Sequence, residues 1–143
     1  MRSVQLVNRR TGHPIATAVE LAESRRSRRR GLLGRDSLDP SAALVLTPCC
    51  SIHTAFMRFA IDAVFVDRDG RVLKIVKALP PWRAAWAARA HAVVELTGGR
   101  LRDDELLVGD SVYLVPVEVQ SDNGAGQSAV SSIVRMTAAT HPS

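Results

Sequence analysis

The chain has 143 residues, of which 46% are hydrophobic and 23% charged. These values fit one globular domain and exclude a collagen-like, mucin-like or wholly disordered chain. No run of about 18 apolar residues occurs, so the sequence offers no transmembrane helix. Two cysteines are too few for a disulfide-rich scaffold.

The charge is unevenly distributed along the chain. The formal net charge is +5, and residues 1–35 carry nine arginines against two glutamates. Residues 36–143 carry slightly more acidic than basic side chains. The first 21 residues lack the apolar stretch of a secretory signal, which predicts a cytoplasmic protein with reduced thiols.

The first third of the chain predicts a hairpin followed by a helix. Residues 4–8 and 15–21 alternate between apolar and polar side chains, as half-buried strands do, around a Gly-His-Pro turn. Ser24 is a candidate N-cap for a helix over residues 25–33, and Gly34 is a candidate end.

The rest of the chain predicts short strands. They are expected at residues 42–47, 62–67, 72–77, 92–96 and 111–119, and Asp69-Gly70 closes the second and third into a hairpin. Residues 83–90 have helix-forming composition or form a long loop, and residues 101–106 suit one or two helical turns. We expect one mainly-β domain over residues 1–119, a compact antiparallel barrel or sandwich with one or two short helices, and a flexible polar tail over 120–143.

Four segments resemble one known family. The run His53–Val72 is similar to the central motif of the domain of unknown function 192, and Arg30–Arg35, Val94–Leu96 and Val108–Val112 resemble three of its other segments. Ala60 stands where the family usually has proline. The resemblance implies a jelly-roll-like β domain with no established activity. Relatives in actinobacteria are encoded near pilus-assembly genes, which suggests an accessory role in pilus assembly.

The centre of this motif supplies the first candidate site. We expect a ligand-binding cleft beside His53, Met57, Arg58 and Asp62. In an extended strand His53 and Met57 would share one face, and Arg58 could hold a small anionic ligand. The alternative is structural: an Arg58–Asp62 pair that stabilises the fold.

A second candidate is a thiol site. Cys49 and Cys50 precede His53, and a nearby imidazolium lowers the pKa of a thiol, so a small thiol-dependent enzyme is an alternative function. Thiolate and imidazole also bind zinc, but the chain lacks the ligand spacing of a zinc site, and we predict no metal or cofactor. The simpler interpretation is structural, with one cysteine in the core and the other at the end of a strand.

A third candidate is the arginine-rich segment, whose members are Arg25, Arg26, Arg28, Arg29 and Arg30. On a helix they spread over about 200° and form a solvated face that could meet a protein partner. Nucleic-acid binding is disfavoured because no aromatic side chain lies near the segment; an acidic protein or anionic lipid is an alternative partner. Trp82 and Trp86 would mark a recognition surface if exposed, but we expect Trp82 to cover an end of the sheet.

Together these observations predict a non-enzymatic binding or accessory module, expected to be a monomer. The thiol enzyme, and binding of nucleic acid or an acidic partner through Arg25–Arg30, remain the alternatives.

Overall fold

A computed structural model describes residues 2–118, which form ten β-strands and one short helix. The elements are β1 (Arg2–Asn8), β2 (Pro14–Ala16), β3 (Ala18–Ala22), α1 (Arg25–Arg30), β4 (Ala42–Leu46), β5 (Ser51–His53), β6 (Ile61–Val66), β7 (Val72–Leu79), β8 (Ala84–Trp86), β9 (Ala92–Thr97) and β10 (Val112–Glu118). The tail predicted over 120–143 lies outside the described residues. Across residues 2–118 no helix has the length and apolar character needed to cross a membrane.

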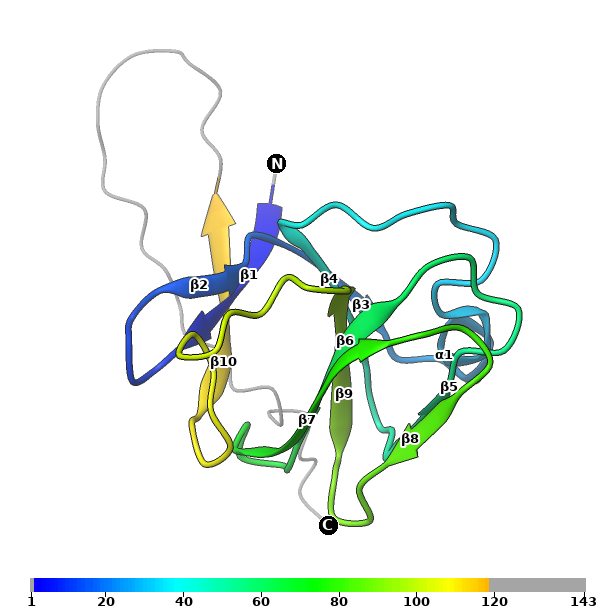
Figure 1. Cartoon of the computed structure of the whole chain (residues 1–143). Coiled ribbons are helices and arrows are strands. Elements are labelled where there is room, and N and C mark those ends of the chain that lie inside the picture. The colour runs from blue at the N-terminus through cyan, green and yellow to red at the C-terminus, as the bar shows by residue number, and fades with distance from the viewer. Residues whose placement is uncertain (1, 119–143) are drawn as a thin grey trace, which may run out of the picture.

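The strands form three sheets (Figure 1). A three-stranded sheet has the order β10-β1-β2, and a five-stranded sheet has the order β3-β4-β9-β6-β7. The third is the two-stranded ribbon β5-β8. All pairings are antiparallel except that of β3 with β4. The fold is therefore mainly β and sandwich-like, as predicted, and the sheets do not close into a barrel.

The two faces of the five-stranded sheet bury different side chains, because successive residues of a strand point to opposite faces. On β9, Val94 and Leu96 pack with Leu6 and Leu114 of the three-stranded sheet. On the opposite face, Val93 belongs to a second core. That core also includes Leu32 after α1, Ile52 of β5 and Ala85 of β8. The large sheet is thus the middle layer, with the three-stranded sheet on one side and α1 with the β5-β8 ribbon on the other.

The hairpin predicted through Asp69-Gly70 is confirmed. Strands β6 and β7 pair antiparallel, and Gly70 has a φ of 81° in the turn between them. A Cβ on Gly70 would lie 2.3 Å from the carbonyl oxygen of Val112, so this turn closely contacts β10. The Gly70 carbonyl accepts a hydrogen bond from the Val112 N–H at 2.9 Å, which links the two larger sheets.

Three local predictions need correction. The alternation over residues 15–21 is not one strand: the chain leaves β2 at Thr17 and continues as β3 in a different sheet. Residues 84–86 form strand β8 rather than a helix, because they pair with β5. Residues 101–106 form turns. In the first two cases pairing with distant segments overrides local propensity.

Helix α1 is confirmed at its start and is shorter than predicted. Ser24 caps it through its side chain, which accepts from the Ser27 N–H, and Ser27 reciprocates. The helix ends at Gly31, whose positive φ of 47° breaks it three residues before Gly34. Three of its arginines lie in the last turn, where positive charge interacts favourably with the helix dipole.

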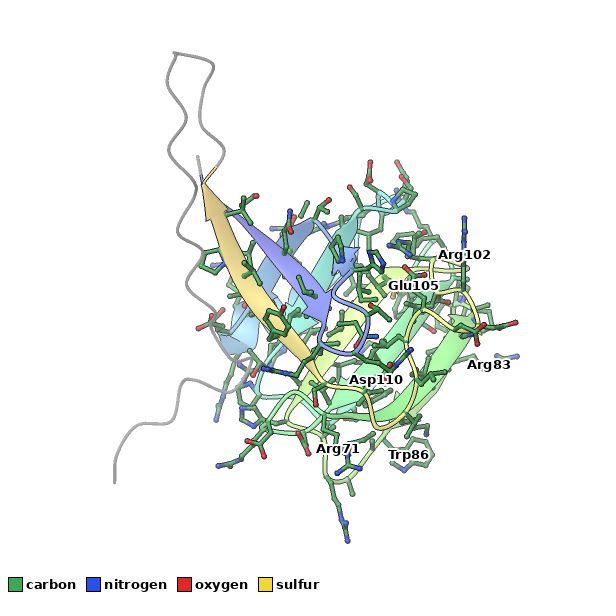
Figure 2. The ribbon with its side chains drawn as sticks, turned by 90° about the vertical axis from the view of Figure 1, so that its left-hand side faces the viewer. Arg71, Arg83, Trp86, Arg102, Glu105 and Asp110 are labelled. Carbon is green, nitrogen blue, oxygen red and sulfur yellow. The ribbon has the colours of Figure 1, made fainter. Side chains whose placement is uncertain are left out.

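A polar network holds the end of β1 against the loop before β10. The carboxylate of Asp110, which is labelled in Figure 2, accepts hydrogen bonds from the side chains of Asn8 and Arg10. The Arg10 hydrogen bond, helped by the Leu107 N–H, holds the pKa of Asp110 down to about 2. Through Asp110, this network gives the Val-Gly-Asp segment at residues 108–110 a structural role in the fold.

Candidate ligand-binding site

A cavity of about 290 Å³ lies between the middle sheet, α1 and the β5-β8 ribbon. We call it the Glu95 cavity. It is lined by Arg28, Arg29, Arg30, Gly31, Leu32, Leu33, Leu46, Cys49, Ser51, Ile52, His53, Met57 and Glu95. Its size is near the lower end of ligand-binding cavities, roughly 300 Å³. Its lining combines an apolar wall with a few polar groups, which is the usual make-up of a small-molecule site.

Glu95 occupies a position that the fold otherwise fills with apolar residues. It lies in the central strand β9 on the same face as Val93, and its partners across the sheet are Leu44 and Ala63. The residue is only 4% exposed. Its Oε2 atom has no hydrogen-bond partner among the described residues. A buried, unpaired carboxyl oxygen is costly, so its presence needs an explanation.

The environment of Glu95 makes it a proton-responsive group. Burial raises the pKa of this carboxyl from 4.5 to about 7, and the positive charge of Arg35 opposes the rise. Near neutral pH the group can therefore donate a hydrogen bond when protonated or accept two when ionised. A ligand in the cavity could satisfy the free oxygen in either state.

Cys49 and His53 line the same cavity from the segment that leads into and through β5. The Cys49 thiol is half-buried and donates to the Ser51 carbonyl oxygen at 3.0 Å. Burial raises its pKa, which keeps it protonated at neutral pH. Cys50 is exposed and does not line the cavity.

The arginines beside the cavity come from α1. The guanidinium of Arg28 donates to the backbone carbonyls of Glu23 and Thr47, so this side chain ties α1 to the end of β4. Arg29 and Arg30 are exposed, as are Arg25 and Arg26. The helix thus presents positive charge to solvent while its last turn borders the Glu95 cavity.

The structure brings together two of the four residues expected to form the ligand cleft. His53 and Met57 line the Glu95 cavity, whereas Arg58 and Asp62 are absent from its lining. The extended strand assumed to hold His53 and Met57 ends at His53, and the chain then turns at Phe56 with a φ of 65°. This turn separates Arg58 from the cavity.

Arg58 and Asp62 have separate partners. Arg58 is exposed and pairs with Asp36 at 2.5 Å, so the suggested Arg58–Asp62 ion pair does not form. Asp62 is fully buried, and its two carboxylate oxygens accept hydrogen bonds from the N–H groups of Ala78, Gly99 and Leu101. Asp62 therefore anchors the loops at one end of the sheet.

The expectation that Trp82 covers the sheet is wrong. Trp82 is 60% exposed and Trp86 65% exposed. The small ribbon β5-β8 covers the second core with Ile52 and Ala85 instead. The bulky aromatic side chains are left at the surface.

Sequence reasoning missed Glu95 as a candidate functional residue, although a signal was present. A glutamate stands in the apolar strand Ala92-Val93-Val94-Glu95-Leu96, where a charge would normally mark the solvent-facing side. Only the sheet order shows that β9 is central and covered on both faces. Over residues 2–118, no three His, Cys, Asp or Glu side chains come together as potential metal ligands.

The architecture and cavity define a small β-sandwich domain with a buried carboxyl at its candidate site. The family model of DUF192, described as an uncharacterized ACR, matches residues 6–114, and the chain belongs to this family. Among curated proteins none matches this chain significantly.

Two solved structures are similar to it. One is a protein of unknown function from Novosphingobium aromaticivorans DSM 12444, with a TM-score of 0.65 and 25% sequence identity over 76% of this chain and 81% of that chain. The other, described as a "putative transcription regulator" from Sinorhizobium meliloti 1021, has a TM-score of 0.66 and 22% identity, over 78% of this chain and 90% of that one. The second shows a shared fold alone.

Proposed function

We propose that this protein is a non-enzymatic binding module that takes a small ligand in the Glu95 cavity. The single observation that carries the proposal is the unpaired Oε2 atom of Glu95, buried at the wall of a cavity. Leaving a buried polar atom unpaired costs about 1–3 kcal/mol. A ligand that donates a hydrogen bond to this atom would remove that cost on binding.

The lining supports a ligand with an apolar body and a donor group at one end. Leu33, Leu46, Ile52 and Met57 supply apolar surface, and Glu95 supplies the acceptor. The anionic ligand expected from Arg58 loses that support, because Arg58 does not line this cavity. Arg28, Arg29 and Arg30 border the cavity and would attract an anion, but the anion would have no hydrogen to donate to the unpaired oxygen of Glu95. An amide or amidinium group meets the requirement directly.

The geometry gives less support to the thiol enzyme. Cys49 and His53 border one cavity, but the raised pKa of Cys49 keeps the thiol in its unreactive, protonated form. The arginine-rich helix supports a separate partner surface, and a role in pilus assembly would need such a partner. Neither a thiol enzyme nor a partner surface on α1 explains why the Glu95 carboxyl is buried without a hydrogen-bond partner for its Oε2 atom.

The test uses three probes of nearly equal shape: benzamide, benzamidine and benzoate. Each is titrated into isotope-labelled protein while backbone amide NMR shifts are recorded. We expect benzamide or benzamidine, but not benzoate, to shift the amides of residues that line the Glu95 cavity. The substitution Glu95→Leu should abolish those shifts, whereas Glu105→Gln, outside the cavity, should leave them unchanged. Probe binding that persists in Glu95→Leu, or no shift with any probe, would contradict the proposal.

A further inference from the structure

Three aromatic side chains of the β5-β8 ribbon and its loops are exposed. Phe56 is 72% exposed, Trp82 60% and Trp86 65%. All three belong to the β5-β8 ribbon or to the loops that continue from it: Trp86 ends β8, Phe56 follows β5 and Trp82 precedes β8. In Figure 2, Trp86 and the neighbouring Arg83 point away from the body of the protein. We call these three aromatic residues the aromatic surface.

The backbone holds two of these side chains in an unfavourable conformation. Phe56 and Trp82 both have a φ of 65°, the left-handed region that bulky residues avoid. Their rings contact each other, with centroids 4.6 Å apart. Such strain persists only where surrounding structure enforces it, and it gathers at functional positions.

Buried Thr54 enforces this arrangement. Its hydroxyl donates to the Pro80 carbonyl oxygen at 2.7 Å and accepts from the Arg83 N–H at 2.9 Å. Its carbonyl oxygen accepts from the N–H groups of Trp82 and Met57. One fully buried residue thus joins both loops and presents Phe56 and Trp82 side by side at the surface.

The surroundings of the aromatic surface are basic. Residues 47–60 and 80–91, which contain the ribbon and its loops, include three arginines and no acidic residue. Arg58 is paired with Asp36, while Arg83 and Arg89 are exposed. Helix α1 lies beside β5 in Figure 1, and its arginines Arg28, Arg29 and Arg30 line the same cavity as β5. Lys74 lies 5.7 Å from the centre of the Trp86 ring.

We propose that the aromatic surface docks this protein onto an anionic lipid bilayer, with Phe56, Trp82 and Trp86 entering the interface and the arginines contacting lipid phosphates. Exposed Trp and Phe beside Arg and Lys are the combination that binds at the headgroup boundary. The positive charge of α1 and the ribbon complements a negative membrane surface.

Two observations favour a membrane over other anionic partners. None of the three aromatic side chains lines the Glu95 cavity or either of the cavities described around Arg100, so none of these three cavities would hold a peptide anchor at this surface. The Phe56 and Trp82 rings are inclined by 60° to each other, which restricts the open ring faces on which nucleic-acid bases would stack. A bilayer needs neither a pocket nor open ring faces.

Intrinsic fluorescence provides a direct test, because Trp82 and Trp86 are the only tryptophans of the chain. The full-length protein is mixed with phosphatidylcholine vesicles that contain either no anionic lipid or about 30% phosphatidylglycerol. We expect a blue shift of the emission and co-sedimentation only with the anionic vesicles, and both should weaken as salt is raised.

Substitutions test which side chains contact the bilayer. Phe56→Asn and Trp82→Asn remove the aromatic rings while keeping a residue that tolerates a left-handed backbone. Each should weaken vesicle partition by roughly tenfold, because apolar area buried in the interface is lost. Arg25→Gln with Arg26→Gln should weaken it through charge alone. Val108→Asn removes an apolar side chain that is 63% exposed on another loop and should change nothing.

Three outcomes would overturn the proposal. The first is unchanged emission and no sedimentation with the anionic vesicles. The second is a loss of binding in Val108→Asn as large as that in Trp82→Asn. The third is tight binding to a thymidine oligonucleotide that depends on Phe56 and Trp82 when vesicles do not bind, which would assign the surface to nucleic acid.

Discussion

At the scale of single residues, Glu95 is the group whose chemistry depends most on its surroundings. The same carboxyl on the solvent side of an edge strand would be fully hydrated. In β9 it is enclosed between two neighbouring strands and faces α1 and the ribbon. Burial at this position in the fold raises the pKa of Glu95 to about 7.

This raised pKa predicts a specific dependence of stability on pH. Between pH 4.5 and 7 the folded protein keeps a proton on Glu95 that the unfolded chain has lost, so the free energy of unfolding falls as pH rises through this window. Well above pH 7 the cost is fully present, at about 3 kcal/mol. Glu95→Gln should therefore gain stability relative to the unsubstituted protein as pH rises from 5 to 8.

Urea unfolding of both proteins at pH 5, 6, 7 and 8 measures the effect. Glu23→Gln, an exposed carboxyl outside the cavity, serves as the control and should run parallel to the unsubstituted protein. If the difference in the free energy of unfolding between Glu95→Gln and the unsubstituted protein stays constant from pH 5 to 8, Glu95 does not titrate as described.

At the scale of elements, buried polar residues determine how loops join the strands. Asp62 lies in β6 and holds three backbone N–H groups from the end of β7 and from the loop after β9. These groups have no strand partner of their own at the sheet end. The Asp62 carboxylate supplies the hydrogen-bond acceptors that the backbone of a neighbouring strand would otherwise provide.

Asp62→Ala should therefore be strongly destabilising. Removal of the carboxylate leaves three N–H groups without acceptors, and we expect a loss of about 3 kcal/mol or more in the free energy of unfolding. Chemical denaturation measures it. Asp69→Ala, an exposed aspartate in the β6–β7 turn, is the matched control and should cost less than about 1 kcal/mol. Equal losses in the two variants would show that the Asp62 hydrogen bonds add little.

At the scale of the whole molecule, the β6–β7 turn connects the two larger sheets. Gly70 of this turn and Val112 of β10 are hydrogen-bonded, and the Val72 N–H donates to the Asp110 carbonyl oxygen. The sandwich therefore depends on close backbone approach at one point, and only glycine fits that space.

Gly70→Ala tests this junction. The new Cβ would lie 2.3 Å from the Val112 oxygen, in addition to the strain of a positive φ. Gly34→Ala provides a matched control, since Gly34 has a φ of 83° but no atom within 4 Å of an added Cβ. We expect about 1 kcal/mol of destabilisation in Gly34→Ala and at least about 2 kcal/mol more in Gly70→Ala. Thermal or urea unfolding measures both, and equal effects would mean that the sheets can separate here at no cost.

Local sequence signals were sufficient where the interactions are themselves local. Asp69-Gly70 specifies a turn through its backbone preferences, Ser24 caps a helix within three residues, and apolar runs such as residues 42–46 predict buried strands. The His53–Val72 motif and its companion segments were specific enough to indicate the family. These features determined the mainly-β class and most strands.

Tertiary structure alone decided which segments meet. The change of sheet at Thr17 and the pairing of β8 with β5 depend on contacts between residues far apart in the chain, which override local propensity. The same long-range order makes β9 central, so it converts Glu95 from an ordinary strand residue into a buried carboxyl beside His53 and Met57. The turn after His53 separates Arg58 from that cavity and exposes Phe56 and Trp82. Strand order and loop position fix the burial of each side chain, and burial determines its chemistry.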